Sequence, residues 1–149
     1  MKINGHSHLL PYPNQIPRFM KDKEIFWIDE DRAFMRQKNW QRPITSKSFF
    51  LNEKLEWMET NNIDHAVILN LSQLYGNGLA QSDMKQALRF QNDFNAEIQT
   101  NYPKKFTSGF VIHAGFIDGA LWEIERCVEK LNLKVLCLSL IHISEPTRP

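Results

Sequence analysis

Two histidines near the N-terminus are the residues of this sequence best suited to catalytic chemistry. They stand two positions apart, as His6 and His8 in the run N-G-H-S-H-L-L. In a β-strand, side chains at this spacing point to the same face, so both imidazoles would reach one small volume. Imidazole nitrogens bind Zn²⁺, and also Fe, Ni or Co, and a water bound to such an ion ionises near neutral pH. The pair therefore predicts a divalent metal site.

The surrounding pattern has to support this prediction, because with five histidines in 149 residues such a pair also arises by chance. Short apolar runs predict buried strands at residues 64–72, 106–113 and 134–137. Helically spaced apolar residues predict helices over 51–62, 82–102 and 118–131. Ser82 and Asp118 are the predicted N-caps of the last two. With a first strand that carries the histidines, this order predicts parallel strands joined by right-handed crossovers, as in doubly wound sheets and in (β/α)8 barrels.

Residues 9–48 interrupt the regular order. The segment is rich in proline, aromatic and charged residues and has no sustained period. A loop of this length is usually functional or disordered, and its aromatic content favours an ordered flap. In a parallel barrel it would leave the C-terminal end of strand one, the face where barrel active sites lie.

Four polar residues at or just past the ends of the second and third predicted strands are candidates for substrate contact: His113, Asn70, Gln73 and Tyr75. Barrel enzymes take their catalytic residues from the C-terminal ends of strands. The alternative is ordinary loop chemistry, with His113 as a loop histidine without a role. No catalytic residue beyond the metal ligands is identified from the sequence.

Charge and hydropathy exclude several kinds of partner. Eighteen basic residues against 17 acidic ones leave a formal net charge of +1, so no charge surplus favours phosphate backbones or anionic membranes. No run approaches the roughly 18 apolar residues of a membrane span, and the N-terminal segment lacks the apolar region of a signal peptide. Cys127 and Cys137 lie far apart, without C-x-x-C spacing. We expect a cytoplasmic protein that binds a small molecule, and neither nucleic acid nor a membrane.

Several stretches resemble one enzyme family. The opening K-I-N-G-H-S-H resembles the first strand of the amidohydrolase superfamily. The stretch N-D-F-N-A-E-I-Q-T-N-Y-P-K-K-F, followed by G-A-L-W-E-I-E-R-C-V-E-K-L-N-L-K-V-L, is similar to the amidohydrolase-related branch that includes aminocarboxymuconate-semialdehyde decarboxylase. In that branch a helix ends at a Pro-x-[Lys/Arg]-Phe step into strand three, here Pro103 to Phe106. The resemblance covers residues 1–137.

This resemblance implies the N-terminal half, about four βα units, of a (β/α)8 TIM-like barrel that binds one divalent metal, usually zinc. It implies hydrolysis or nonoxidative decarboxylation of a small carboxylated or carbonyl-bearing molecule. Only His6 and His8 carry over as metal ligands, because the family's other ligands come from strands five, six and eight. We expect the parent protein to be a metal-dependent enzyme, with homo-oligomer formation left open, and the chain as given to be inactive.

The last residues do not resemble natural protein sequence. Residues 138–148, L-S-L-I-H-I-S-E-P-T-R, match one translated frame of a transposase adapter used in short-read DNA sequencing, residue for residue. Such scars are set aside when a fold is considered. We therefore expect a barrel domain over residues 1–137 that stops at about its fourth strand, and an adapter-derived artefact over 138–149.

Two alternatives stay open. Metal-dependent phosphoesterases and nucleases of other barrel families also open with H-x-H on strand one, although the near-neutral charge weighs against nucleic acid. The chain as given could also be a catalytically inert α/β fragment whose exposed strand edge drives association.

Overall fold

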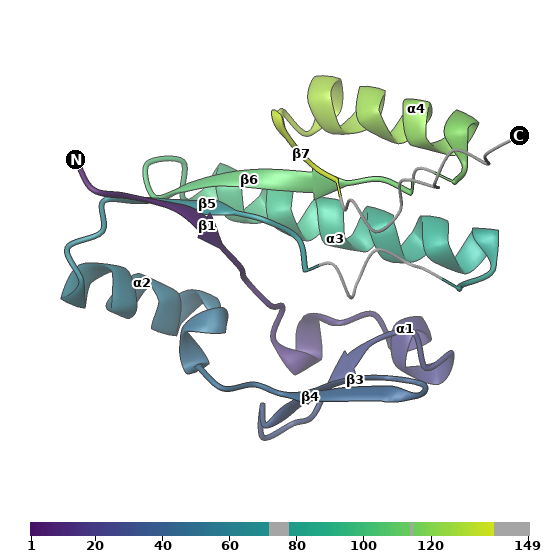
Figure 1. Ribbon diagram of the computed structural model, residues 1–149, viewed down its shortest axis with the longest axis horizontal. Coiled ribbons are helices and arrows are strands. Elements are labelled where there is room, and N and C mark those ends of the chain that lie inside the picture. The colour runs from purple at the N-terminus through teal and green to yellow at the C-terminus, as the bar shows by residue number, and fades with distance from the viewer. Residues whose placement is uncertain (72–77, 114, 139–149) are drawn as a thin grey trace, which may run out of the picture.

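Strands and helices alternate along most of the chain in the computed structural model, which describes residues 1–71, 78–113 and 115–138 (Figure 1). In chain order the elements are β1 (Ile3–Ser7), η1 (Pro13–Gln15), α1 (Arg18–Asp22), β2 (Trp27–Ile28), β3 (Phe34–Gln37), β4 (Trp40–Pro43), η2 (Lys47–Phe49), α2 (Leu51–Thr60), β5 (His65–Ile68), α3 (Gln81–Asn101), β6 (Phe106–Val111), α4 (Ile117–Glu125), η4 (Arg126–Lys130) and β7 (Val135–Cys137). The short η1 and η2 are 3-10 helices, and η4 is a π-helical continuation of α4.

The main sheet has four parallel strands in the order β1-β5-β6-β7 (Figure 1). Helices α2, α3 and α4 lie in the three connections between these strands. The parallel α/β order predicted from the sequence is therefore confirmed. The predicted N-caps Ser82 and Asp118 are wrong, because α3 and α4 begin one residue earlier and both side chains lie inside the first turn.

Strand β5 is shorter than its apolar run predicts. Its last pair with β6 joins Ile68 to Ser108, and beyond this point side chains of α3 bind the edge of β6 instead. Asn95 Nδ2 donates to the Gly109 carbonyl oxygen at 2.7 Å. Asn92 both accepts from Val111 N–H, at 2.9 Å, and donates to Val111 O, at 3.0 Å. These amides satisfy backbone groups that a longer β5 would have paired.

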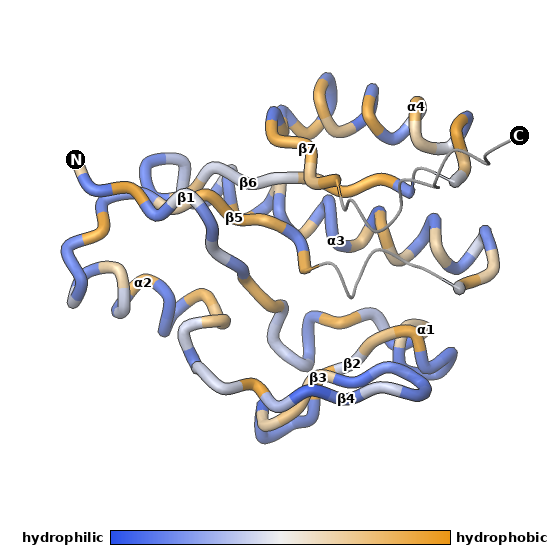
Figure 2. The backbone as a smooth tube through the Cα atoms, in the orientation of Figure 1, coloured by the Kyte–Doolittle hydropathy of each residue, from blue (hydrophilic) through white to orange (hydrophobic). Residues whose placement is uncertain are grey.

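Helices α2 and α3 pack against one face of the main sheet. Met58 of α2, Ile98 of α3 and Ile68 of β5 share one buried cluster, and Phe110 of β6 packs with Cys127 of η4 in another. Figure 2 shows hydrophobic colour along β5 and β7 and hydrophilic colour along β4. None of the described helices combines the length and hydrophobicity needed to cross a bilayer.

The segment between β1 and α2 is ordered, as its aromatic content predicts, but it is more than a loop. It holds a second sheet of antiparallel strands in the order β2-β3-β4, preceded by α1. Its core includes Met20, Phe26 and Phe50, each 1% exposed or less, and Ala87 of α3 packs into the same cluster. Strands of two to four residues are too short for an alternating pattern to reveal.

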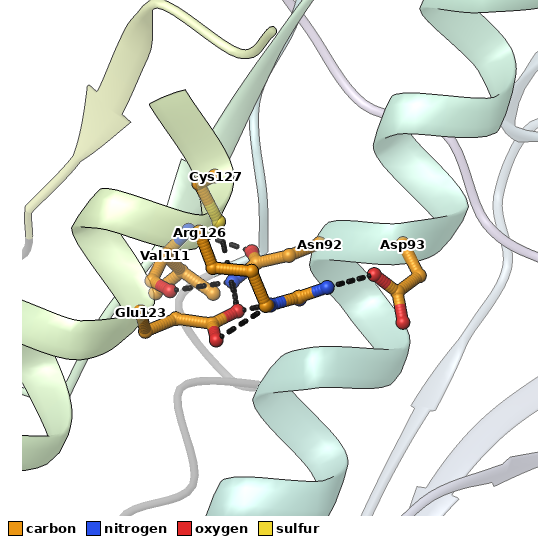
Figure 3. A network of polar contacts seen from close by, with 6 residues as sticks. All are labelled: Asn92, Asp93, Val111, Glu123, Arg126 and Cys127. Atoms are coloured by element: carbon orange, nitrogen blue, oxygen red, sulfur yellow. Dashed lines mark hydrogen bonds and ion pairs between the residues drawn. The ribbon is translucent and has the colours of Figure 1, made fainter. Parts of the chain in front are cut away.

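A polar network ties α3 to α4 and η4 (Figure 3). Arg126 binds both oxygens of Glu123, at 2.9 and 2.7 Å, and also Asp93 Oδ1 at 2.6 Å. Asn92 Nδ2, which holds the end of β6, donates to Glu123 Oε1 at 2.7 Å. The end of β6 is thus linked to both helices that flank it.

Candidate metal centre

A bulge in β1 sets the direction of the first histidine. The strand pairs with β5 at Asn4–Ala66 and next at Ser7–Ile68, so β1 uses one residue more than β5 over the same span. Asn4 Oδ1 accepts a hydrogen bond from His6 N–H at 3.1 Å, which closes a local turn at this point. Bulges bend a strand and re-aim a side chain. The turn-favouring pair Asn4-Gly5 inside a strand was the sequence signal for this bulge.

The two imidazole rings meet at the end of β1. Nε2 of His6 lies 3.1 Å from Nε2 of His8, and the rings are edge to face with centroids 4.9 Å apart. His8 Nδ1 lies 2.8 Å from the carbonyl oxygen of Leu69, just beyond β5. In the neutral ring Nδ1 carries the proton and donates to this oxygen. The Nε2 lone pair is then directed at the shared volume, which is the usual arrangement of a metal-binding histidine.

The distance between the two nitrogens fits coordination of one ion. With metal–nitrogen bonds of about 2.0–2.1 Å, two imidazole nitrogens lie about 3.3–3.4 Å apart at a tetrahedral angle and about 2.8–3.0 Å apart at a right angle. The observed 3.1 Å falls between these values. Within the described part of the chain, no group of three or more His, Cys, Asp or Glu side chains could hold a metal. The pair therefore fits as two ligands of a site whose remaining ligands are not among the described residues.

The electrostatic surroundings favour the neutral form of His8. Burial lowers the pKa of His8, the hydrogen bond to Leu69 opposes this, and the positive charges of His6, Lys54 and Arg42 lower the pKa further. Neutral imidazole is the form that binds metals, so His8 is available to a metal at lower pH than a free histidine.

Lys54 is a site residue that the sequence interpretation missed. It lies in α2 and is 5% exposed. Its Nζ donates to Ser7 Oγ at 2.8 Å, and Ser7 is the residue between the two histidines in the sequence. Burial lowers the pKa of its ammonium group. The signal was available, because Lys54 follows Leu51 by three positions and precedes Met58 by four, which places it on the apolar stripe of the helix.

Asn70 turns toward α3. It is buried, accepts a hydrogen bond from Asn95 Nδ2 at 3.2 Å, and donates to Gln91 Oε1 at 3.5 Å. These contacts give Asn70 a part in joining the end of β5 to α3. Its contact with substrate stays a prediction.

His113 lies beside a small apolar cavity between α3 and α4, which Leu88, Phe116 and Trp122 help to line. Its Nδ1 is buried and has no hydrogen-bond partner among the described residues. The structure thus brings His6 and His8 together and gives His113 a different set of neighbours. Gln73 and Tyr75 lie outside the described residues, so their roles also stay predictions.

No protein-family model matches the chain. It is 22% identical to a 2-amino-3-carboxymuconate-6-semialdehyde decarboxylase of Dictyostelium discoideum, over 89% of the chain and 38% of that relative. The predicted resemblance is confirmed. The chain spans 38% of the length of this relative, so the similarity covers only part of a whole enzyme.

Solved structures give the fold. The 2,6-dihydroxybenzoate decarboxylase of Rhizobium matches with a TM-score of 0.56 and 18% identity, over 89% of the chain and 36% of that structure. The 5-carboxyvanillate decarboxylase of Sphingomonas paucimobilis matches with a TM-score of 0.60 and 16% identity, over 91% and 41%. These neighbours are TIM-barrel amidohydrolases. The four parallel strands therefore belong to a half-barrel rather than to a doubly wound sheet.

A third neighbour carries a metal. The dihydroxybenzoic acid decarboxylase of a Polaromonas species, solved with bound manganese and the inhibitor 2-nitroresorcinol, matches with a TM-score of 0.54 and 14% identity, over 89% of the chain and 35% of that structure.

Proposed function

We propose that residues 1–137 form the N-terminal half of a metal-dependent decarboxylase of the amidohydrolase type, with His6 and His8 as two of the metal ligands. The observation that carries this proposal is the 3.1 Å approach of the two Nε2 atoms at the end of β1. The anchoring of His8 Nδ1 on Leu69 O supports it, because a fixed tautomer is what a metal ligand needs. Similarity to three named decarboxylases favours loss of CO₂ over hydrolysis.

Zn²⁺ is the ion we propose, because two imidazoles suit it well, and Mn²⁺ is the alternative. When bound, the ion would hold oxygen atoms of the substrate and stabilise the negative charge that develops on them. The hydrogen bond to Leu69 orients His8, and burial favours its neutral form, so His8 could bind the ion through Nε2 without rearrangement.

The proposed substrate is a small carboxylated molecule. Two cations from different elements, Lys54 of α2 and Arg42 of β4, act on His8 through their charges. A positive field of this kind attracts a carboxylate, and the exposed guanidinium of Arg42 can bind one in a bidentate manner. Asn70, Gln73, Tyr75 and His113 remain the proposed further contacts.

Metal binding tests the proposal directly. Zn²⁺ is titrated into the chain and into His6→Ala and His8→Ala, and bound metal is measured after equilibrium dialysis. Each substitution should lower the affinity more than about tenfold, because a ligand is lost. His65→Ala is the matched control, since His65 binds Lys104 O and Thr107 Oγ1 at the start of β5. Equal losses in all three variants would exclude a site at the pair.

Resequencing of the genomic locus tests where the barrel sequence of this chain ends. We propose that residues 138–149 come from adapter sequence, so resequencing of the locus should show a reading frame that continues past Cys137 with further βα units. A frame that encodes the same residues 138–149 in independent genomic DNA would refute this.

A further inference from the structure

Three hydrogen bonds connect α2 to the histidine pair. Lys54 Nζ donates to Ser7 Oγ at 2.8 Å. Leu69 N–H donates to the Ser7 carbonyl oxygen, also at 2.8 Å, and Leu69 O accepts from His8 Nδ1. Ser7 is therefore held by its side chain from the helix and by its backbone from the neighbouring strand end.

We propose that Lys54 is a positioning residue of the metal site, which fixes Ser7 so that His6 and His8 are presented together on the opposite side of β1. This inference rests on the metal site proposed above. It assigns Lys54 a role through Ser7, without contact to metal or substrate.

The bulge explains why β1 needs such a hold. Backbone pairing with β5 is interrupted between Asn4 and Ser7, which is the stretch that contains His6. A strand is poorly fixed where its ladder is broken, and pairing resumes only at Ser7. A bond to the Ser7 side chain from outside the sheet restores the lost constraint at that position.

The chemistry of Lys54 also calls for a role beyond stability. Its ammonium is buried, and its contacts are a neutral hydroxyl and the face of Trp57, with Nζ 5.1 Å from the ring centroid. No acidic side chain in the described part of the chain forms an ion pair with it. Burying a charge with so little compensation is costly, and an apolar side chain would be at least as stable there. The hydrogen bond at β1 is what Lys54 provides and methionine would not.

The first measurement is the tautomer of His8 in the metal-free chain, read from long-range ¹H–¹⁵N spectra above the ordinary pKa of histidine. The unaltered chain should show one form, protonated at Nδ1. Lys54→Met should show exchange between both tautomers with no loss of melting temperature, and Lys54→Arg, which keeps the charge and the donors, should restore the single form. A single Nδ1-protonated form in Lys54→Met, or lower melting without a tautomer change, would overturn the inference.

The second measurement separates the hydrogen bond from the charge of Lys54, which itself repels a metal ion. Zn²⁺ affinity is compared for the unaltered chain, Ser7→Ala, Lys54→Met and the double variant. Ser7→Ala leaves the charge of Lys54 in place and should weaken metal binding roughly tenfold. In the chain that already carries Lys54→Met the hydrogen bond is absent, so adding Ser7→Ala should change the metal affinity by less than about twofold. If Ser7→Ala weakened metal binding by the same factor with and without Lys54→Met, Lys54 would not act through Ser7.

The outcomes distinguish this inference from the proposed function. If His6→Ala and His8→Ala leave Zn²⁺ binding intact, the proposed metal site itself is wrong. If they abolish it while Ser7→Ala and Lys54→Met have no effect, only the role of Lys54 fails. Ser7→Ala leaves the buried ammonium of Lys54 without its hydrogen-bond acceptor. If that variant fails to fold, the tautomers of His8 in Lys54→Met and Lys54→Arg still test the role of Lys54.

Discussion

Glu123 is a carboxylate held away from water, and its neighbours decide its charge. It is 5% exposed. Burial alone would raise the pKa of Glu123, but the hydrogen bonds from Arg126 and Asn92 outweigh burial and keep the pKa below its usual value. A group whose pKa is lowered on folding stabilises the fold above its unfolded pKa and loses this contribution as the pH falls through the folded value.

Glu123→Gln should therefore lower the free energy of unfolding by about 3 kcal/mol near neutral pH, because it breaks a buried ion pair. The difference from the unaltered chain should shrink as the pH falls below 4.5, the ordinary value for glutamate. Urea unfolding over a pH series measures this. Glu125→Gln, at a neighbouring exposed position, is the control and should change the free energy of unfolding little. A difference in the free energy of unfolding between Glu123→Gln and the unaltered chain that does not vary with pH would contradict this prediction.

At the scale of single residues, the sequence points to the proposed ligands more readily than to the residues that orient them. His6 and His8 are only two positions apart, so their spacing predicts that both rings lie on one face of a strand. Lys54 reaches Ser7 across 47 positions, and Leu69 reaches His8 across 61. Such contacts depend on the packing of α2 and β5 against β1, which no local pattern encodes.

Among the elements, β6 shows how closely neighbouring strands approach. Gly109 faces the side chain of Cys137, and a Cβ at Gly109 would lie 2.6 Å from Cys137 Sγ and 3.1 Å from the carbonyl oxygen of Val135. The Cys137 side chain is 8% exposed, so it has little room to turn away. Glycine at this position lets β6, β7 and the end of β5 come together.

Gly109→Ala should destabilise the protein by about 1–3 kcal/mol through overpacking. Adding Cys137→Ala removes the nearest atom and should recover part of the loss, leaving the contact with Val135 O. Thermal or urea unfolding of both single variants and the double variant gives the coupling. Additive losses would show that the sulfur atom is not the source of the strain.

Periodicity predicts the elements well where they are long. The spacing of apolar residues in α2, α3 and α4 and the runs of β5, β6 and β7 all correspond to observed elements. It fails for the sheet β2-β3-β4, whose strands are too short to show a period, and for the end of β5, where Asn92 and Asn95 replace strand pairing. Those side chains belong to a helix pattern and give no sign of binding a strand.

For the whole molecule, the order of helices and strands left two architectures open, and similarity to solved barrels resolved them. A doubly wound sheet and a half-barrel share the same alternation, because curvature comes from the sum of small twists between strands. The H-x-H motif at the end of strand one favours the barrel only through resemblance. The candidate site is likewise predictable in part, since the sequence points to the pair His6 and His8 and to no further metal ligand.

The register of the main sheet has a consequence for how the molecule assembles. Gly109 of β6 pairs with Val135 of β7, a loop of 26 residues, whereas Ile3 of β1 pairs with His65 of β5 across 62. Closing the longer loop costs about 0.8 kcal/mol more in chain entropy, which corresponds to about a fourfold slower step. The strand that carries the histidines should therefore dock last, after the β5–β7 layer has formed. Pulse-labelling hydrogen exchange during refolding should show the Leu69 amide, which donates to Ser7 O, protected after the Ala66 amide, which donates to Lys105 O at the start of β6. Simultaneous protection would argue for a single collapse. Newly made chains would then complete the β5–β7 layer before His6 and His8 are brought to it, so the pair proposed as metal ligands takes shape only on a finished scaffold.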